Sequence, residues 1–212
     1  MADNYVETMG KIKKGVKILF IVSMLLSLAS IVLLVVFNFA GVIHIQTIEG
    51  NKYASGFDYP GWQILYWGVG DMIIQGYTEY TFNIWNTLAV FVPLFACLVT
   101  GIMYLKSYKV RGTNKKKAIL EIIAGVALLF GAIMIINCDK FAIANASRVK
   151  DSYVDYYSKY LLPALNGETS YGKTIYPLIV MIVGLVGAVV KFANAALLLF
   201  QKSYAKKAKA NQ

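Results

Sequence analysis

Four uninterrupted apolar blocks dominate the sequence, and each is long enough to cross a lipid bilayer as a helix. About 20 helical residues span the hydrocarbon, and a run of 18 or more apolar residues indicates a candidate span. The blocks occupy residues 18–40, 82–105, 118–137 and 175–200. Only 15% of the 212 residues are charged, against roughly 25% in soluble domains. The sequence therefore predicts an all-α membrane protein, a bundle of four transmembrane helices.

The first block has a rival interpretation as a cleaved signal peptide, because basic residues precede it. Signal peptides carry an apolar region of about 7–15 residues, followed by a cleavage site of small residues. This run exceeds that length and ends in Phe37, Asn38 and Phe39. We favour a retained transmembrane helix.

Basic residues gather in three segments that four spans bring to the same side of the membrane. These are the amino-terminal segment 1–17, the loop 106–117 and the tail 201–212. Short loops rich in lysine and arginine stay in the cytoplasm. We therefore expect both termini in the cytoplasm and place 41–81 and 138–174 outside, in a multi-pass protein of the plasma membrane.

The net charge of +10 does not indicate nucleic-acid binding, because the basic residues flank the apolar blocks. A nucleic-acid partner needs them on one surface. Membrane lipids are the expected partners instead. The chain has 19 lysines and two arginines, which suggests an AT-rich, bacterial genome.

Both outer loops contain patterns typical of secondary structure, which predicts a small extracytoplasmic β/α cap. Residues 42–48 alternate in polarity and precede the turn signal 49–51, as in a strand that ends in a hairpin. We expect 62–67 to be its partner strand, with an interfacial or re-entrant segment over 62–74 as the alternative. Aromatic residues at helical spacing over 149–160 predict an amphipathic helix in the second loop.

Lys191 is the one charge deep inside a span, eleven residues or roughly 16 Å before Lys202 at helical rise. A charge there costs about 2.5–3.5 kcal/mol and suggests a functional site. Glu121 enters the third span from the same side, so the two can form an ion pair. A structural pair or a lysine reaching the headgroups is the favoured interpretation, and a transport role is the alternative. Asn194, with the asparagines Asn38, Asn86 and Asn137, is expected to hydrogen-bond between helices.

Small residues recur at spacings that let helix backbones approach one another. They are Ser23, Ser27 and Ser30 in the first block, Ala127 and Gly131 in the third, and Gly184 and Ala188 in the fourth. We expect these faces to pack inside the bundle, with self-association as the alternative.

Ten aromatic residues lie between Tyr53 and Trp85. Some belong to the interfacial belt of membrane proteins, but clustered Tyr and Trp also mark binding surfaces. The candidate partner-binding residues are Tyr59, Trp62, Tyr66, Trp67 and Tyr77.

Catalysis and metal binding have little support in the sequence. The chain has one histidine, His44, and two cysteines, Cys97 and Cys138, in or beside apolar blocks. We therefore expect no enzyme, cofactor or metal site. A serine–lysine pair would need Ser23 or Ser27 beside Lys191.

The order of these elements resembles the claudin-like tetraspan arrangement. That family carries a Gly-Leu-Trp element and a cysteine pair in its first outer loop. Here the segment Ile64-Leu65-Tyr66-Trp67 is only loosely similar to that element, and the loop has no cysteine. The resemblance therefore implies topology alone, and no functional residue is transferred.

Together these features predict a non-enzymatic four-span membrane protein whose aromatic outer loops contact a protein partner, another copy or the envelope. The alternative is a subunit of an oligomeric channel or small-solute transporter that uses Lys191 and Glu121. A lipid-modifying enzyme is a third, less favoured class.

Overall fold

The structure, a computed structural model, describes residues 2–49, 52–62, 83–107, 110, 113–141 and 169–210. The chain forms two compact units, each built from separate segments. The first, here called the helical unit, comprises Met1–Ile31, Val92–Phe130 and Val183–Gln212. The second, here called the sheet unit, comprises Val32–Phe91 and Gly131–Ile182.

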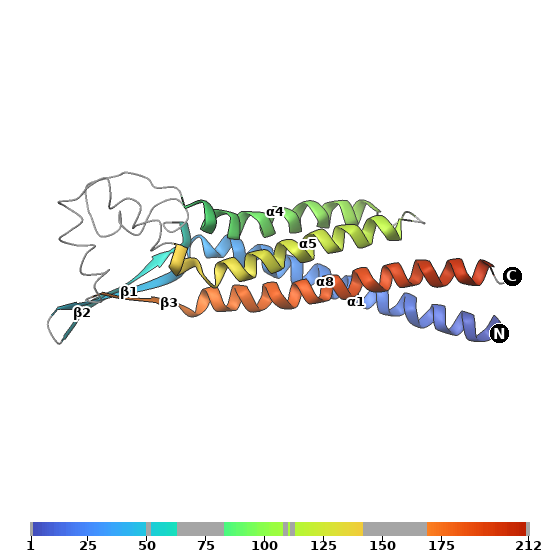
Figure 1. The fold of residues 1–212 in the computed structure, drawn as a ribbon, viewed down its shortest axis with the longest axis horizontal. Helices are drawn as coiled ribbons and strands as arrows, with labels where there is room; N and C mark the ends of the chain where they lie inside the picture. The colour runs from blue at the N-terminus through green and yellow to red at the C-terminus, as the bar shows by residue number, and fades with distance from the viewer. Residues whose placement is uncertain are drawn as a thin grey trace. The chain divides into compact units, whose positions relative to one another are not determined.

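Four long helices contribute most of the described residues (Figure 1). They are α1 (Ala2–Phe37), α4 (Ile84–Ser107), α5 (Asn114–Ile135) and α8 (Ile175–Ala210). Each contains a stretch long and apolar enough to cross a membrane: Glu7–Phe37, Ile84–Ser107, Asn114–Ile135 and Ile175–Lys206. The prediction of four candidate spans in a mostly helical chain is confirmed. Helices α1 and α8 also continue through the basic segments at the two ends of the chain.

The helical unit buries several polar residues beside its apolar core and exposes many apolar ones. Its buried polar positions are Ser23, Ser27, Ser30, Thr100, Lys117, Glu121, Lys191 and Asn194. Its exposed apolar positions include Leu25, Leu28, Phe95, Ile123, Val126 and Val189. Water would favour the opposite arrangement, whereas lipid solvates apolar side chains and leaves polar ones to bond inside the bundle. This pattern fits an integral membrane protein.

Helix α1 buries one narrow stripe of residues at alternating spacings of four and three. The stripe comprises Ser23, Ser27, Ser30, Leu34 and Phe37, all below 5% exposure. This is the spacing of a coiled-coil seam. The three serines place small side chains along the first half of the stripe, which allows a close approach of neighbouring helices.

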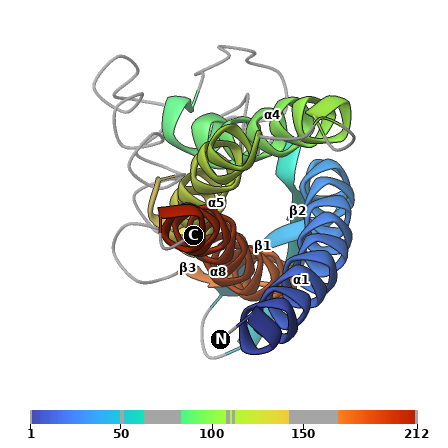
Figure 2. The same ribbon diagram turned by 90° about the vertical axis from the view of Figure 1, so that its right-hand side faces the viewer.

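Helices α5 and α8 lie side by side in the helical unit, as the view along the helices indicates (Figure 2). A Cβ at Gly125 of α5 would lie 2.9 Å from the ring of Phe192. A Cβ at Gly187 of α8 would lie 3.1 Å from the side chain of Leu128. Glycine therefore permits close contact on both helices. The expected small residues Ala127, Gly131, Gly184 and Ala188 are also buried.

The sheet unit contains a three-stranded antiparallel sheet in the order β2-β1-β3. Strand β1 (Gly41–Glu49) pairs with β2 (Lys52–Pro60), with Glu49 opposite Lys52 and Ile43 opposite Tyr59. On its other edge, β1 pairs with β3 (Thr169–Lys173) over five residue pairs. The strand predicted at 42–48 is therefore present.

The predicted partner strand was wrong, because β1 pairs with Lys52–Pro60 and not with 62–67. Two residues, Gly50 and Asn51, separate the paired positions, the shortest common hairpin connection. Trp62 lies in a helical turn after β2, and 63–67 fall outside the described residues, as does most of the alternative interfacial segment. The helix predicted at 149–160 also falls outside them.

Hydrogen bonds join the sheet to the two helices that continue its strands. The Thr174 backbone N–H donates to Val42 O at 3.1 Å. The Thr174 hydroxyl donates to Gly41 O at 2.6 Å, and the Tyr176 hydroxyl donates to Leu33 O at 2.8 Å. The end of α1 and the start of α8 are thus held together where the sheet begins.

Gly61 lies where the chain leaves β2 and returns to the end of α1. Its N–H donates to Ala40 O at 3.1 Å, and the N–H of Trp62 donates to Asn38 O at 2.9 Å. A Cβ at Gly61 would overlap the carbonyl oxygen of Phe37. Only glycine fits this contact without a shift of the backbone.

Helix α4 begins with an asparagine cap in the sheet unit. The Oδ1 of Asn83 accepts a hydrogen bond at 3.2 Å from the backbone N–H of Asn86, three residues further along the chain. This satisfies one of the free donors at a helix start. The Asn83 amide also donates to Phe141 O at 3.0 Å, and the Asn86 amide donates to Cys138 O at 3.1 Å. The cap therefore also fixes the segment that follows α5.

Candidate functional site

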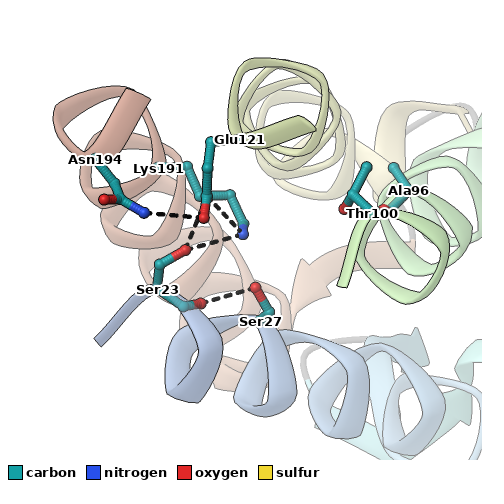
Figure 3. Close-up of polar contacts among 7 residues, drawn as sticks. All are labelled: Ser23, Ser27, Ala96, Thr100, Glu121, Lys191 and Asn194. Carbon is teal, nitrogen blue, oxygen red and sulfur yellow. Dashed lines mark hydrogen bonds and ion pairs between the residues drawn. The ribbon is translucent and has the colours of Figure 1, made fainter. Parts of the chain in front are cut away.

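Four side chains from three helices form a closed hydrogen-bonded group in the helical unit, here called the buried polar cluster (Figure 3). The cluster comprises Ser23 of α1, Glu121 of α5, and Lys191 and Asn194 of α8. The Lys191 ammonium lies 3.2 Å from Glu121 Oε2 and donates to Ser23 Oγ at 3.1 Å. Ser23 Oγ donates to Glu121 Oε2 at 2.9 Å, and Asn194 Nδ2 donates to Glu121 Oε1 at 3.0 Å.

Every member of the cluster is excluded from the surface. Ser23 and Asn194 are 0% exposed, Glu121 is 3% exposed and Lys191 is 4% exposed. A lysine that reached the headgroups would leave its ammonium near the surface. The structural ion pair with Glu121 is therefore the arrangement found, and the alternative of a lysine extended to the headgroups is not.

Helical periodicity explains how these residues meet. Lys191 and Asn194 are three residues apart, so they share one face of α8. Ser23 belongs to the buried stripe of α1, and its position is supported by Ser27, whose hydroxyl donates to Ser23 O at 2.8 Å. On α4, Thr100 donates to the Ala96 carbonyl of its own helix and makes no bond to the cluster in Figure 3.

The cluster satisfies one carboxylate with three donors from two neighbouring helices. An ionised carboxylate only accepts hydrogen bonds, so Ser23, Lys191 and Asn194 are suitable partners. Removing one partner of such a buried ion pair destabilises a protein far more than the intact pair stabilises it. The chemistry of this arrangement is that of a cross-link between α1, α5 and α8.

The distance between Lys191 and Ser23 also meets one requirement of a serine–lysine catalytic pair. In such a pair, a neutral lysine accepts the serine proton. Here the lysine donates to the serine, and the serine donates to Glu121. Both groups are also hydrogen-bonded to the Glu121 carboxylate.

The predicted asparagine bonds divide into two kinds. Asn194 and Asn86 link separate segments, as expected. Asn38 instead donates to Leu34 O and Val35 O, and Asn137 donates to Ile133 O, within their own helical turns. For these two, the side-chain bonds that the described residues show stay within one helical turn, so bonds between helices stay a prediction.

The predicted partner-binding residues are only partly described. Tyr59 belongs to β2 and is opposite Ile43 of β1. Trp62 is partly buried beside the end of α1. Tyr66, Trp67 and Tyr77 lie outside the described residues.

Sequence reasoning missed part of the role of two residues. Ser23 was assigned to a packing face and named with Ser27 as a possible neighbour of Lys191, but its bond to Glu121 was not predicted. Asn83 was passed over, although an asparagine at the start of an apolar helix is a helix-cap signal. The sequence could not decide between Ser23 and Ser27, because the rotation of α1 relative to Lys191 depends on packing.

Both cysteines are buried and have free thiols. Cys138 follows α5 in the sheet unit, where burial, with a smaller contribution from Asp139, raises the pKa of its thiol to about 12. This thiol is mostly protonated at neutral pH and is a poor nucleophile. Cys97 packs with Leu128 and Ala188 in the helical unit.

No protein-family model matches this chain, and a search of curated proteins found no match. Its function therefore has to be argued from the residues themselves.

Proposed function

We propose that this chain is a non-enzymatic integral membrane protein whose spans hold a small sheet for contact with a protein partner, another copy or the envelope. One observation carries the proposal: the sheet is directly continuous with two spans. Three residues separate α1 from β1, and Thr174 alone separates β3 from α8. Such short, hydrogen-bonded connections suit a sheet that is held at the membrane surface.

The distribution of basic residues supports one orientation. We place the amino-terminal segment, the loop 106–117 and the carboxyl-terminal tail in the cytoplasm, and the sheet outside the plasma membrane. In this orientation the sheet is part of an extracytoplasmic cap, and the chain has a claudin-like order of elements without sharing that family's residues.

The sheet offers an edge that suits protein contact. Strand β2 is nine residues long, and among the described residues it pairs on one side only, with β1. An unpaired edge presents backbone donors and acceptors to another chain, and an extended partner segment can add to it as a further strand. Tyr59 and Trp62 lie in and next to this strand, which keeps both as candidate contact residues.

A channel or transporter subunit is the second candidate, favoured by the ion pair of Lys191 and Glu121 within the spans. Intramembrane charges often mark ion or proton pathways. Two features argue against transport. Ser23 and Asn194 also hydrogen-bond to the ion pair, and small residues allow the helices to pack closely around it. These features suit a stable cross-link better than a site that exchanges solutes.

Photo-crosslinking in native membranes tests the proposed contact. A benzophenone amino acid would replace Tyr59 or Trp62, with Phe95 as the aromatic control. Phe95 is 58% exposed on the apolar surface of the helical unit. We expect the same protein adduct from Tyr59 and Trp62 and none from Phe95.

The adduct should also form when the identified partner carries the crosslinker. Absence of protein adducts at Tyr59 and Trp62, and at Tyr66, Trp67 and Tyr77, would contradict the proposal. A solute flux in purified proteoliposomes that Lys191→Met abolishes while assembly persists would favour the second candidate.

A further inference from the structure

The helical unit contains a pocket of about 190 Å³ between its four helix segments. It is lined by Lys13, Val16, Lys17 and Phe20 of α1, Tyr104 of α4, Asn114 and Lys117 of α5, and Leu198 and Gln201 of α8. This volume is below the roughly 300–1,000 Å³ of pockets for drug-sized ligands. The pocket therefore suits a small group.

The charged side chains of the lining are all basic. The lining contains three lysines, Lys13, Lys17 and Lys117, and no acidic residue. Among the described side chains of this unit, the acidic ones belong to other contacts: Glu7 pairs with Lys11 at 2.7 Å, and Glu121 belongs to the buried polar cluster. An anion is the charge that this lining favours.

The amino terminus of α5 adds to the same preference. Asn114 and Lys117, both in its first turn, line the pocket. The N–H of Lys117 donates to Thr113 O at 2.9 Å, so Thr113 lies directly before the first turn of the helix. The start of a helix and its dipole favour negative charge.

The remaining lining is apolar and aromatic. The rings of Phe20 and Tyr104 stack with centroids 4.8 Å apart, and the Lys117 ammonium lies 6.0 Å from the centre of the Tyr104 ring. Tyr104 and Leu198 also form a buried core with Ala118 and Ala195. A ligand in this pocket thus meets charge on one side and hydrocarbon on the other.

The pocket lies at the boundary between the polar and apolar parts of each helix. On α1 the apolar block begins after Lys17, on α5 it begins after Lys117, and on α8 it ends before Gln201. Lipid phosphates lie at this level of a membrane. Basic pockets between transmembrane helices are known to hold anionic headgroups.

We propose that this pocket binds the phosphate of an anionic phospholipid headgroup. Lys13, Lys17 and the start of α5 hold the phosphate, Asn114 and Gln201 bond to its substituents, and Phe20, Tyr104 and Leu198 pack against the glycerol and the first acyl carbons. Asn114 Nδ2 already donates to Gln201 Oε1 at 3.1 Å, which fixes both side chains at the pocket. The proposal needs only that the chain is a membrane protein and is independent of any contact made by the sheet.

Lipid binding can be measured on the full chain in a neutral detergent by native mass spectrometry and by thermal unfolding. The probes are phosphatidylglycerol, phosphatidylcholine and inorganic phosphate. We expect phosphatidylglycerol to be retained and to raise the melting temperature, and the other two to have little effect. An equal effect of inorganic phosphate, or of phosphatidylcholine, would overturn the assignment to an anionic lipid.

Matched lysines on one helix separate the pocket from general surface charge. Lys13→Gln and Lys17→Gln remove pocket lysines, and Lys14→Gln removes an exposed lysine of α1 that does not line the pocket. Removal of each pocket lysine should weaken phosphatidylglycerol binding about fivefold, and Lys14→Gln should leave it within about twofold. Equal losses from Lys14→Gln and Lys17→Gln would refute a defined site.

Discussion

Replacing Lys191 by methionine tests directly what the buried polar cluster does. The change removes an ammonium that lies 3.2 Å from Glu121 Oε2 and donates to Ser23 Oγ at 3.1 Å. The Glu121 carboxylate, 3% exposed, then lacks its cation. Removing one partner of a buried ion pair costs about 3–5 kcal/mol. At about 2–4 °C per kcal/mol for a chain of this size, the melting temperature in detergent should fall by roughly 6–20 °C.

Two further variants make this result interpretable. The double substitution Lys191→Met with Glu121→Gln removes both charges and keeps an amide oxygen that can accept from Asn194. Its stability should lie within about 2 kcal/mol of wild type, well short of the sum of the two single losses. Lys202→Met, at an exposed position of the same helix, should change the melting temperature by no more than about 2 °C. Wild-type stability of Lys191→Met, or additive losses in the double variant, would refute a structural cross-link.

Three other predictions concern the sheet unit. Gly61→Ala should destabilise the protein by about 3 kcal/mol in thermal unfolding, because the new methyl group overlaps Phe37 O. The control Gly10→Ala, whose new methyl group would have nothing within 4 Å, should be neutral or slightly stabilising. Asn83→Ala should lower stability by about 1–2 kcal/mol through loss of the α4 cap, and an unchanged melting temperature would contradict that role. With Cys97 replaced by alanine, Cys138 should react slowly with maleimide at pH 7. The labelling rate should still rise above pH 10, because the pKa of the Cys138 thiol is raised to about 12. Fast labelling that levels off near pH 9 would instead show an exposed thiol.

The four spans were predictable because hydropathy is a local property of the sequence. Twenty apolar residues need a helix in lipid whatever surrounds them. The pairing of Glu121 with Lys191 could also be predicted, because both residues lie in the cytoplasmic half of the expected spans and each buried charge needs an opposite charge. For the serine, the sequence left a choice between Ser23 and Ser27, because the place in the cluster depends on how α1 is rotated against α5 and α8.

The sheet shows why strand partners are harder to infer than spans. Lys52–Pro60 contains glycine, aspartate and proline, which are all poor strand formers. Its pairing is decided by the short connection after Glu49 and by the register with β1. The aromatic stretch from Trp62 looked more like a strand by composition alone, but β1 has its two edges occupied by β2 and β3.

The geometry of the buried polar cluster bears on the choice between anchoring and transport. A carrier has to break and remake contacts with its charged residues in each cycle. In the described structure, one carboxylate takes bonds from three side chains, and two of those donors come from α8. Separating α8 from α5 would break both and leave two charges in hydrocarbon, at about 2.5–3.5 kcal/mol each. The proposed function, in which the bundle holds the sheet, needs no exchange of that kind, so the contacts that weaken the proposal of transport are compatible with the proposal of an anchor.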